Sequence, residues 1–114
     1  MALNYNLSKV YSLSDNDPEF VIQIISLFVT EVPLDLKQID LGIKTKDHKL
    51  SYAYAHKIKP TFDLLGMSMA HEEILQVEAW TKAEGKKKEI EATFISIQDL
   101  VDKAIKEIKK DFEL

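Results

Sequence analysis

The segment from Asp47 to Gly66 places one histidine among several lysines at helical spacing. On a helix that turns about 100° per residue, His56 falls on the polar side and Ile58 on the opposite, apolar side. An exposed imidazole can act as a nucleophile through one ring nitrogen near neutral pH. The pattern predicts a histidine that is free to react, although a surface histidine without a function has the same pattern. The residues that fall near His56 on this wheel are Lys49, Tyr52, Lys59, Pro60 and Asp63.

A histidine that carries a phosphoryl group needs nearby positive charge and a partner for its second ring nitrogen. Lys59 follows His56 by one helical turn and supplies the charge. A carboxylate on a neighbouring helix would hold the second nitrogen, as carboxylates do for metal-binding histidines. Between Lys37 and Lys59 six residues are lysines and two are acids, so this surface favours an acidic partner.

The composition excludes several other kinds of chemistry. The chain has 114 residues, of which 46% are hydrophobic, and this predicts one globular domain. It contains no cysteine, which excludes disulfides, thiolate zinc sites and a cysteine nucleophile. All 15 basic residues are lysines and the net charge is -4, which argues against nucleic-acid binding. His71 and the two glutamates after it lack the spacing of metal-binding helix motifs, so we expect no metal and no cofactor bound by this chain.

No apolar run is long enough to cross a bilayer, and the first ten residues do not resemble a signal peptide. We therefore expect a cytoplasmic protein without membrane contact.

Capping residues and apolar spacing predict helices and no strands. Residues 1–16 form an arm, either a short helix or an extended cover. Asp17 and Pro18 are typical of a helix start, and Pro33 predicts a break or kink near residue 32 before a helix from about Leu34 to Lys44. The residues expected on the apolar side of the first long helix are Phe20, Val21, Ile24, Ile25, Leu27 and Phe28.

Three further helices follow. One runs from Asp47 to about Leu65 and stops at Gly66, and the next begins at Ser68 and ends at Gly85. The last helix has an apolar seam with alternating spacings of four and three residues, made of Ile90, Phe94, Ile97, Val101, Ala104 and Ile108. The sequence therefore predicts an all-α fold, with an arm at residues 1–16 and an up-and-down antiparallel four-helix bundle at residues 17–114.

The run Ala55-His56-Lys57-Ile58-Lys59-Pro60, with Gly66 ten residues after the histidine, resembles the signature of histidine-containing phosphotransfer (HPt) domains. The pattern of that family is Ala-His-x-Leu-Lys-Gly, followed by the same downstream glycine. The similarity spans residues 17–113 and includes Phe20, Phe28, Glu31 and Asp47.

The resemblance implies a phosphorelay intermediate in a two-component system, without an ATP site or kinase activity. His56 would accept a phosphoryl group through Nε2 from the aspartyl phosphate of a receiver domain and pass it to another receiver. Lys59 would offset the phosphoryl charge, and Glu78, twenty-two residues after His56, would bond Nδ1. The residues expected to contact the receiver are Lys49, Tyr52, Lys57, Pro60, Asp63 and Gly66.

The resemblance also implies the partners. These would be response-regulator receiver domains, which bring their own Mg²⁺, and a hybrid sensor kinase. The chain itself is expected to be a monomer.

Pro60 departs from the family pattern, which has glycine at this position. A proline inside a helix removes a backbone donor and costs about 3 kcal/mol, so we expect a kink between residues 56 and 60. The alternative function is therefore an HPt-like adaptor that binds receivers without being phosphorylated. A third is the phosphotransfer module of a larger sensor kinase.

Overall fold

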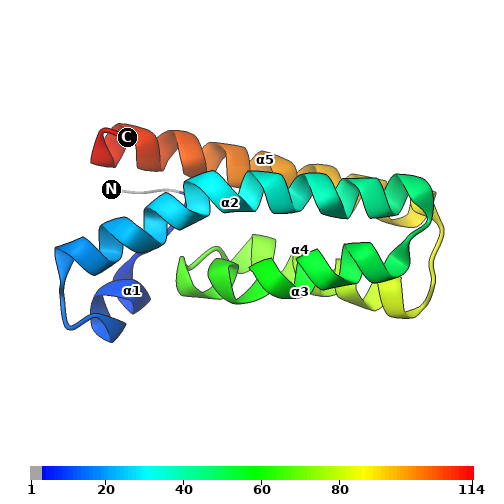
Figure 1. Cartoon of the computed structure of the whole chain (residues 1–114), viewed down its shortest axis with the longest axis horizontal. Helices are drawn as coiled ribbons and strands as arrows, with labels where there is room; N and C mark the ends of the chain where they lie inside the picture. Colours follow the sequence, from blue (N-terminus) through cyan, green and yellow to red (C-terminus); the bar gives the residue numbers. More distant parts are fainter. Residues whose placement is uncertain (1–3) are drawn as a thin grey trace.

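The computed structural model describes residues 4–114, which form five helices and no strand (Figure 1). Their bounds are α1 Ser8–Leu13, α2 Pro18–Thr45, α3 His48–Leu64, α4 Ser68–Lys82 and α5 Lys87–Phe112. The predicted all-helical class is thus confirmed for the described residues. None of these helices is both long and apolar enough to cross a membrane.

The helix ends follow the predicted capping residues in three places. The Asp17 carboxylate accepts a hydrogen bond from the backbone N–H of Glu19 at 3.0 Å, and Asp47 accepts one from Leu50 at 3.1 Å. Gly66 follows α3 with a φ of +64°, a left-handed conformation that glycine adopts at little cost. Because these caps satisfy backbone groups locally, they could be recognised without knowledge of the tertiary structure.

Helix α2 continues through Pro33, so the predicted break near residue 32 is wrong. Proline inside a helix costs about 3 kcal/mol when nothing compensates for it. Val32 and Leu36, on either side of Pro33, are both buried in the core, and their packing offsets this cost. In Figure 1, α2 changes direction along its length but remains one helix, which agrees with a kink, the alternative that the sequence predicted beside a break.

The end of α3 agrees with the prediction, and the end of α4 does not. Helix α3 runs through Pro60 to Leu64 without interruption. Helix α4 ends at Lys82 rather than at Gly85, which lies in the loop before α5. A Cβ at Gly85 would lie within 2.3 Å of the indole ring of Trp80, so this glycine lets the loop pass over the tryptophan.

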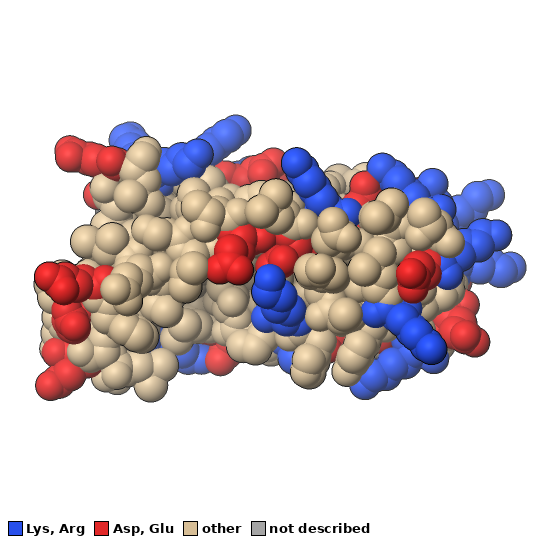
Figure 2. All heavy atoms as spheres, in the orientation of Figure 1, with Lys and Arg blue, Asp and Glu red and all other residues tan. Residues whose placement is uncertain are grey.

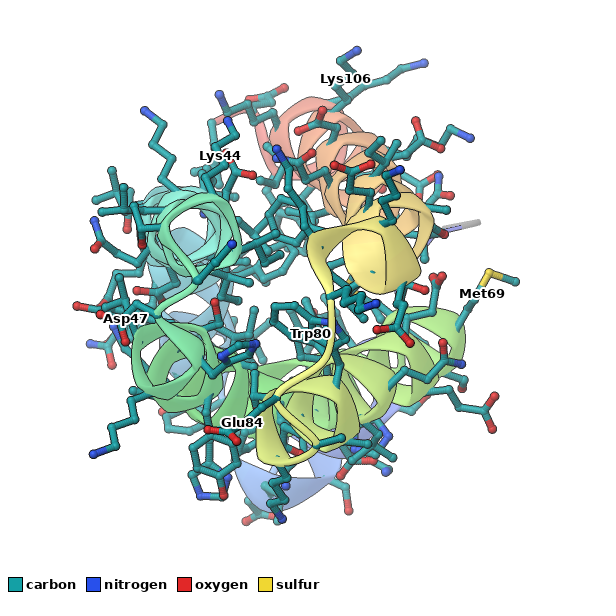
Figure 3. All side chains as sticks on the ribbon, turned by 90° about the vertical axis from the view of Figure 1, so that its right-hand side faces the viewer. Lys44, Asp47, Met69, Trp80, Glu84 and Lys106 are labelled. Carbon is teal, nitrogen blue, oxygen red and sulfur yellow. The ribbon has the colours of Figure 1, made fainter. Side chains whose placement is uncertain are left out.

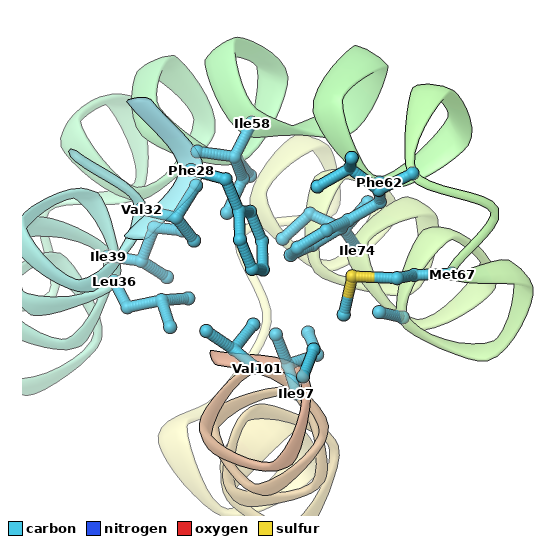
Figure 4. Close-up of a cluster of buried hydrophobic side chains, with 14 of the residues drawn as sticks. Phe28, Val32, Leu36, Ile39, Ile58, Phe62, Met67, Ile74, Ile97 and Val101 are labelled. Atoms are coloured by element: carbon cyan, nitrogen blue, oxygen red, sulfur yellow. The ribbon is translucent and has the colours of Figure 1, made fainter. Parts of the chain in front are cut away.

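The four long helices surround one core, as seen along the long axis of the molecule (Figure 3). Helix α2 packs against α3 and α5, and α4 packs against the same two helices. Figure 4 shows side chains from all four helices meeting in this core. Every residue of the predicted α5 seam is buried, and so are Ile74, Val77 and Trp80 of α4.

The predicted apolar side of α2 is only partly correct. Val21, Ile25 and Phe28 are buried, whereas Phe20 is 37% exposed and Leu27 is 53% exposed. The core-facing side is therefore rotated away from these two residues, although both are as apolar as the buried ones.

The arm before α2 contains both an extended stretch and the short helix α1. Tyr5 and Val10 are buried in the common core. The backbone N–H of Asn6 donates to the carbonyl of Leu65 at 2.7 Å, and the Tyr5 hydroxyl donates to Asp111 at 2.7 Å. The arm is thus fastened to the ends of α3 and α5.

The end of α2 and the start of α3 come closest at Gly42. A Cβ at Gly42 would lie 2.8 Å from the backbone oxygen of Asp47 and 2.8 Å from the backbone nitrogen of Ser51. Ser51 is fully buried, and its hydroxyl donates to the carbonyl of Ile39 at 2.9 Å. The absence of a side chain at Gly42 therefore sets how closely α3 lies on α2.

We expect Gly42→Ala to destabilise the protein by about 1 to 3 kcal/mol, because the added methyl group meets backbone atoms that cannot rotate away. Helix propensity alone predicts the opposite, a gain of about 1 kcal/mol. Chemical denaturation would measure the change, with exposed Ala92→Gly as a control for propensity. A more stable Gly42→Ala protein would contradict the close packing described here.

Candidate functional site

His56 lies on the surface of α3 with one ring nitrogen bonded and the other open. Its side chain is 59% exposed. Nδ1 lies 2.9 Å from Oε2 of Glu78 on α4, the residue expected to bond it. Within residues 4–114, Nε2 has no hydrogen-bond partner. Because a carboxylate can only accept, Nδ1 of the neutral ring carries the proton, and the lone pair of Nε2 points to solvent.

Glu78 is a charged residue at the edge of the core. Its side chain is only 8% exposed, since Val77 and Trp80 on the same helix are buried. Burial acts to raise the pKa of Glu78, but the hydrogen bonds from His56 and Lys59 outweigh it and hold the pKa below its usual value. Glu78 is therefore a carboxylate at neutral pH and a strong acceptor for the imidazole.

Lys59 binds the same carboxylate. Its Nζ lies 3.0 Å from Oε1 and 3.3 Å from Oε2 of Glu78, and its side chain is 27% exposed. The sequence placed Lys59 one turn from His56 but did not indicate that the two share one anion. With a neutral imidazole the trio carries no net charge, because Lys59 balances the carboxylate of Glu78.

Tyr52 packs against the imidazole face. The two rings are nearly parallel, with an interplanar angle of 14° and centroids 5.5 Å apart. The Nζ of Lys82 lies 5.5 Å from the centroid of Tyr52. Tyr52 and His56 are one turn apart on α3, and Glu78 and Lys82 are one turn apart on α4. Sequence reasoning missed Lys82, although its spacing from Glu78 matches that between Tyr52 and His56.

Lys57 follows His56 in sequence but points toward α2. Its Nζ lies 3.0 Å from Oδ1 of Asp35 and 3.7 Å from Oε1 of Glu31. The hydrogen bond to Asp35 raises the pKa of Lys57. Asp35 is buried, and the sequence analysis did not single it out.

The other predicted contact residues separate into two groups. Pro60 is exposed, and Lys49 lies with Tyr52 in a hollow between α3 and the end of α4. Asp63 instead pairs with Lys9 of α1 at 2.8 Å, and Gly66 lies against Asn6. The structure therefore places Asp63 and Gly66 at the arm rather than in the cluster around His56.

An apolar groove lies between α2 and α3, beside Lys57. It has a volume of about 160 Å³, and its walls include Ile24, Phe28, Ile58 and Leu64. The groove and His56 thus lie on the two sides of the same stretch of α3.

The remaining histidines do not form a metal site. Among the described residues, no group of three or more histidines and acids is arranged to hold a metal ion. His48 uses Nε2 to bond the carbonyl of Gly85 at 2.9 Å, and its ring lies 4.7 Å from that of Trp80. His48 therefore contributes to packing where the α2–α3 and α4–α5 connections meet.

Comparison of the chain with protein-family models, with curated proteins and with solved structures finds no significant match. The candidate site is therefore argued from its own geometry.

The lowered pKa of Glu78 predicts how stability depends on pH. The unfolded chain takes up the proton at a higher pH than the folded protein, so the stabilisation by Glu78 is fully present above the unfolded-state pKa and is lost as the pH falls through the folded-state pKa. Near neutral pH we expect Glu78→Gln to cost about 2 kcal/mol.

The native chain and Glu78→Gln should differ less in their free energy of unfolding as the pH falls from about 6 to about 3. Denaturation curves of the native chain and of Glu78→Gln across this range would measure it. A difference that does not change with pH would show that the carboxylate charge contributes nothing.

Proposed function

We propose that this chain is an HPt protein that carries a phosphoryl group on His56 between receiver domains. One observation supports this above all others: an exposed imidazole whose Nδ1 is bound by the nearly buried carboxylate of Glu78 while Nε2 is open. That arrangement fixes the tautomer and directs the nucleophilic nitrogen toward an incoming partner. A surface histidine without a function needs no such buried carboxylate.

The proposal includes a finer description of the fold and its setting. Helices α2 to α5 are interpreted as an up-and-down antiparallel four-helix bundle, with the arm and α1 as an addition at one end. The chain would have no kinase activity of its own and would act in the cytoplasm.

The transfer step needs a nucleophile, a leaving group and charge compensation. Nε2 of His56 attacks the phosphorus of the receiver's aspartyl phosphate in line with the bond that breaks, and the aspartate carboxylate leaves. The proton stays on Nδ1, where Glu78 accepts its hydrogen bond and stabilises the positive ring that forms. Lys59 and the Mg²⁺ that the receiver carries offset the negative charge of the phosphoryl oxygens. Reversal of the same step passes the group to a second receiver.

The surface around His56 supports docking of an acidic partner. Figure 2 shows the face formed by α2 and α3 as mostly uncharged, with lysines gathered toward one end of the molecule. The apolar groove beside Lys57 offers a contact area, and Lys49 and Lys82 flank Tyr52 on the other side of His56. Such a surface attracts the acidic, Mg²⁺-binding site of a receiver and forms a transient interface.

Pro60 is the specific observation in favour of the adaptor alternative. It lies one turn after His56 on the exposed side of α3, where the family's glycine would let a receiver approach closely. An adaptor would bind receivers and remain unphosphorylated with every donor.

Replacement of the nucleophile is the direct test. With a phosphorylated receiver and Mg²⁺, the native chain should gain an acid-labile phosphoryl group and His56→Gln should gain none, because glutamine offers no nucleophilic ring nitrogen. His71→Gln is the matched control and should be labelled like the native chain. Label that persists on His56→Gln, or a native chain that binds phosphorylated receivers yet is never labelled, would end the proposal.

Substitution of Glu78 gives a second test, because glutamine retains a hydrogen-bond acceptor for Nδ1 of His56 and alanine does not. Glu78→Gln keeps an acceptor for the Nδ1 proton, whereas Glu78→Ala removes it. We expect Glu78→Ala to slow transfer about 10-fold or more, and Glu78→Gln to be affected less. Single-turnover transfer rates would measure this, and equal rates for the two variants would exclude Glu78 as the residue that positions His56.

A further inference from the structure

Helix α2 has a second apolar side that no part of the described chain covers. Phe20, Leu27, Leu34 and Leu41 follow one another at intervals of seven residues. They are 37%, 53%, 59% and 47% exposed, respectively. We call these four residues the outer stripe.

The outer stripe lies on the side of α2 away from the core, and its member Leu27 also lines the groove between α2 and α3. At about 100° per residue its members fall within a sector of about 60°. Ile25 and Ile43, nine residues before and after Leu34, point the opposite way, and they are 0% and 3% exposed. Of the other exposed large apolar residues, Ile22 also lies on α2 and is 46% exposed, whereas Ile95 lies on α5 and Met69 on α4.

Four uncharged residues lie three or four positions after members of the stripe: Gln23, Thr30, Gln38 and Thr45. Glu31, Lys37 and Lys44 lie at the same spacings and carry charge. The hydroxyl of Thr30 donates to the carbonyl of Ser26 at 2.9 Å, and that of Thr45 donates to the carbonyl of Leu41 at 2.8 Å. With these hydroxyls bonded to their own helix, the threonine side chains add little polarity to the stripe.

We propose that the outer stripe is the contact surface of a homodimer in which the α2 helices of two copies pack side by side, parallel and in register. Two helices associate through two apolar positions in each seven residues, and the outer stripe supplies one of the two. In a parallel pair each member of the stripe meets its own counterpart across a twofold axis. This goes beyond the phosphotransfer proposal and does not depend on it.

The charges beside the stripe favour the parallel arrangement. Glu31 and Lys37, three residues before and after Leu34, project to opposite edges of the stripe, at about 60° on either side. In a parallel pair the edge with Glu31 meets the edge with Lys37 of the second copy, offset by about 9 Å along the axis. In an antiparallel pair, glutamate meets glutamate at one edge and lysine meets lysine at the other. Glu31 lies 3.7 Å from Lys57 of its own chain but is 49% exposed, so its carboxylate still faces Lys37 of a second copy. This complementarity favours a second copy as the occupant, and the parallel direction.

The size of the surface predicts a weak dimer. The stripe spans 22 residues, or about 32 Å of helix, on a molecule whose longest extent is 42 Å. A contact through a single helix falls at the low end of interface areas, where association is transient. The dimer should therefore form as the concentration rises, in place of the monomer expected from the sequence.

Sedimentation of the full chain from about 10 µM to about 1 mM would test association. The native chain should show a growing dimer fraction, and Leu34→Glu should raise the dissociation constant about tenfold or more. Ile95→Glu is the matched control, because this residue is 63% exposed on α5, and it should dimerise like the native chain. Since all these side chains are exposed, circular dichroism should show folded proteins throughout.

The absence of cysteine allows a test of direction. In the parallel pair, Leu41→Cys alone should form a disulfide-linked dimer under mild oxidation, and so should Leu27→Cys alone. An antiparallel pair would cross-link these two variants only with each other. A native chain that stays monomeric at all concentrations would overturn the proposal. So would an unchanged dissociation constant in Leu34→Glu, or loss of receiver binding in that variant without any dimer in the native chain.

Discussion

The carboxylate of Glu78 is the group on which the rest of the site depends. A charged side chain that is only 8% exposed needs partners for its oxygens, because burial of an unpaired charge costs several kcal/mol. Both partners, His56 and Lys59, come from one turn of α3. Helices α3 and α4 must therefore pack in the register that brings position 78 to this turn. The exposed imidazole of His56 has a fixed orientation because the buried carboxylate of Glu78 accepts a hydrogen bond from it.

Helix α2 connects this site to the whole molecule. Its inner side fills the core, and its side toward α3 carries Asp35 and Glu31, which hold Lys57. At its end, Gly42 lets α3 begin in close contact. Its outer side carries the exposed stripe. One long helix can contribute to the core, to the contact with α3 and to the outer surface because successive residues turn about 100° around its axis. Core packing keeps this helix continuous at Pro33.

Local signals in the sequence predicted what depends on neighbouring residues along the chain. Asp17, Asp47 and Gly66 could be recognised as helix ends, since their role is to satisfy or turn nearby backbone. The seam of α5 could be recognised from its spacing. Pro33 was misread because local rules count the lost hydrogen bond but not the burial of Val32 and Leu36. Leu27 was expected to face the core but is exposed. The periodicity of α2 shows where its apolar residues lie, but it does not show which of its two apolar sides packs into the core.

The sequence by itself determined an all-helical chain with His56 on a polar face and Lys59 one turn away, because both follow from the period of the helix. The family resemblance named Glu78 as the partner of His56, but only the tertiary structure brought Glu78, Lys59 and the imidazole together. Glu78 lies twenty-two positions from His56, and its contact with the imidazole depends on how α4 is placed against α3. That placement results from the packing of side chains from four helices into one core, which no stretch of sequence specifies alone. The same packing left one apolar side of α2 outside, where a second molecule can reach it.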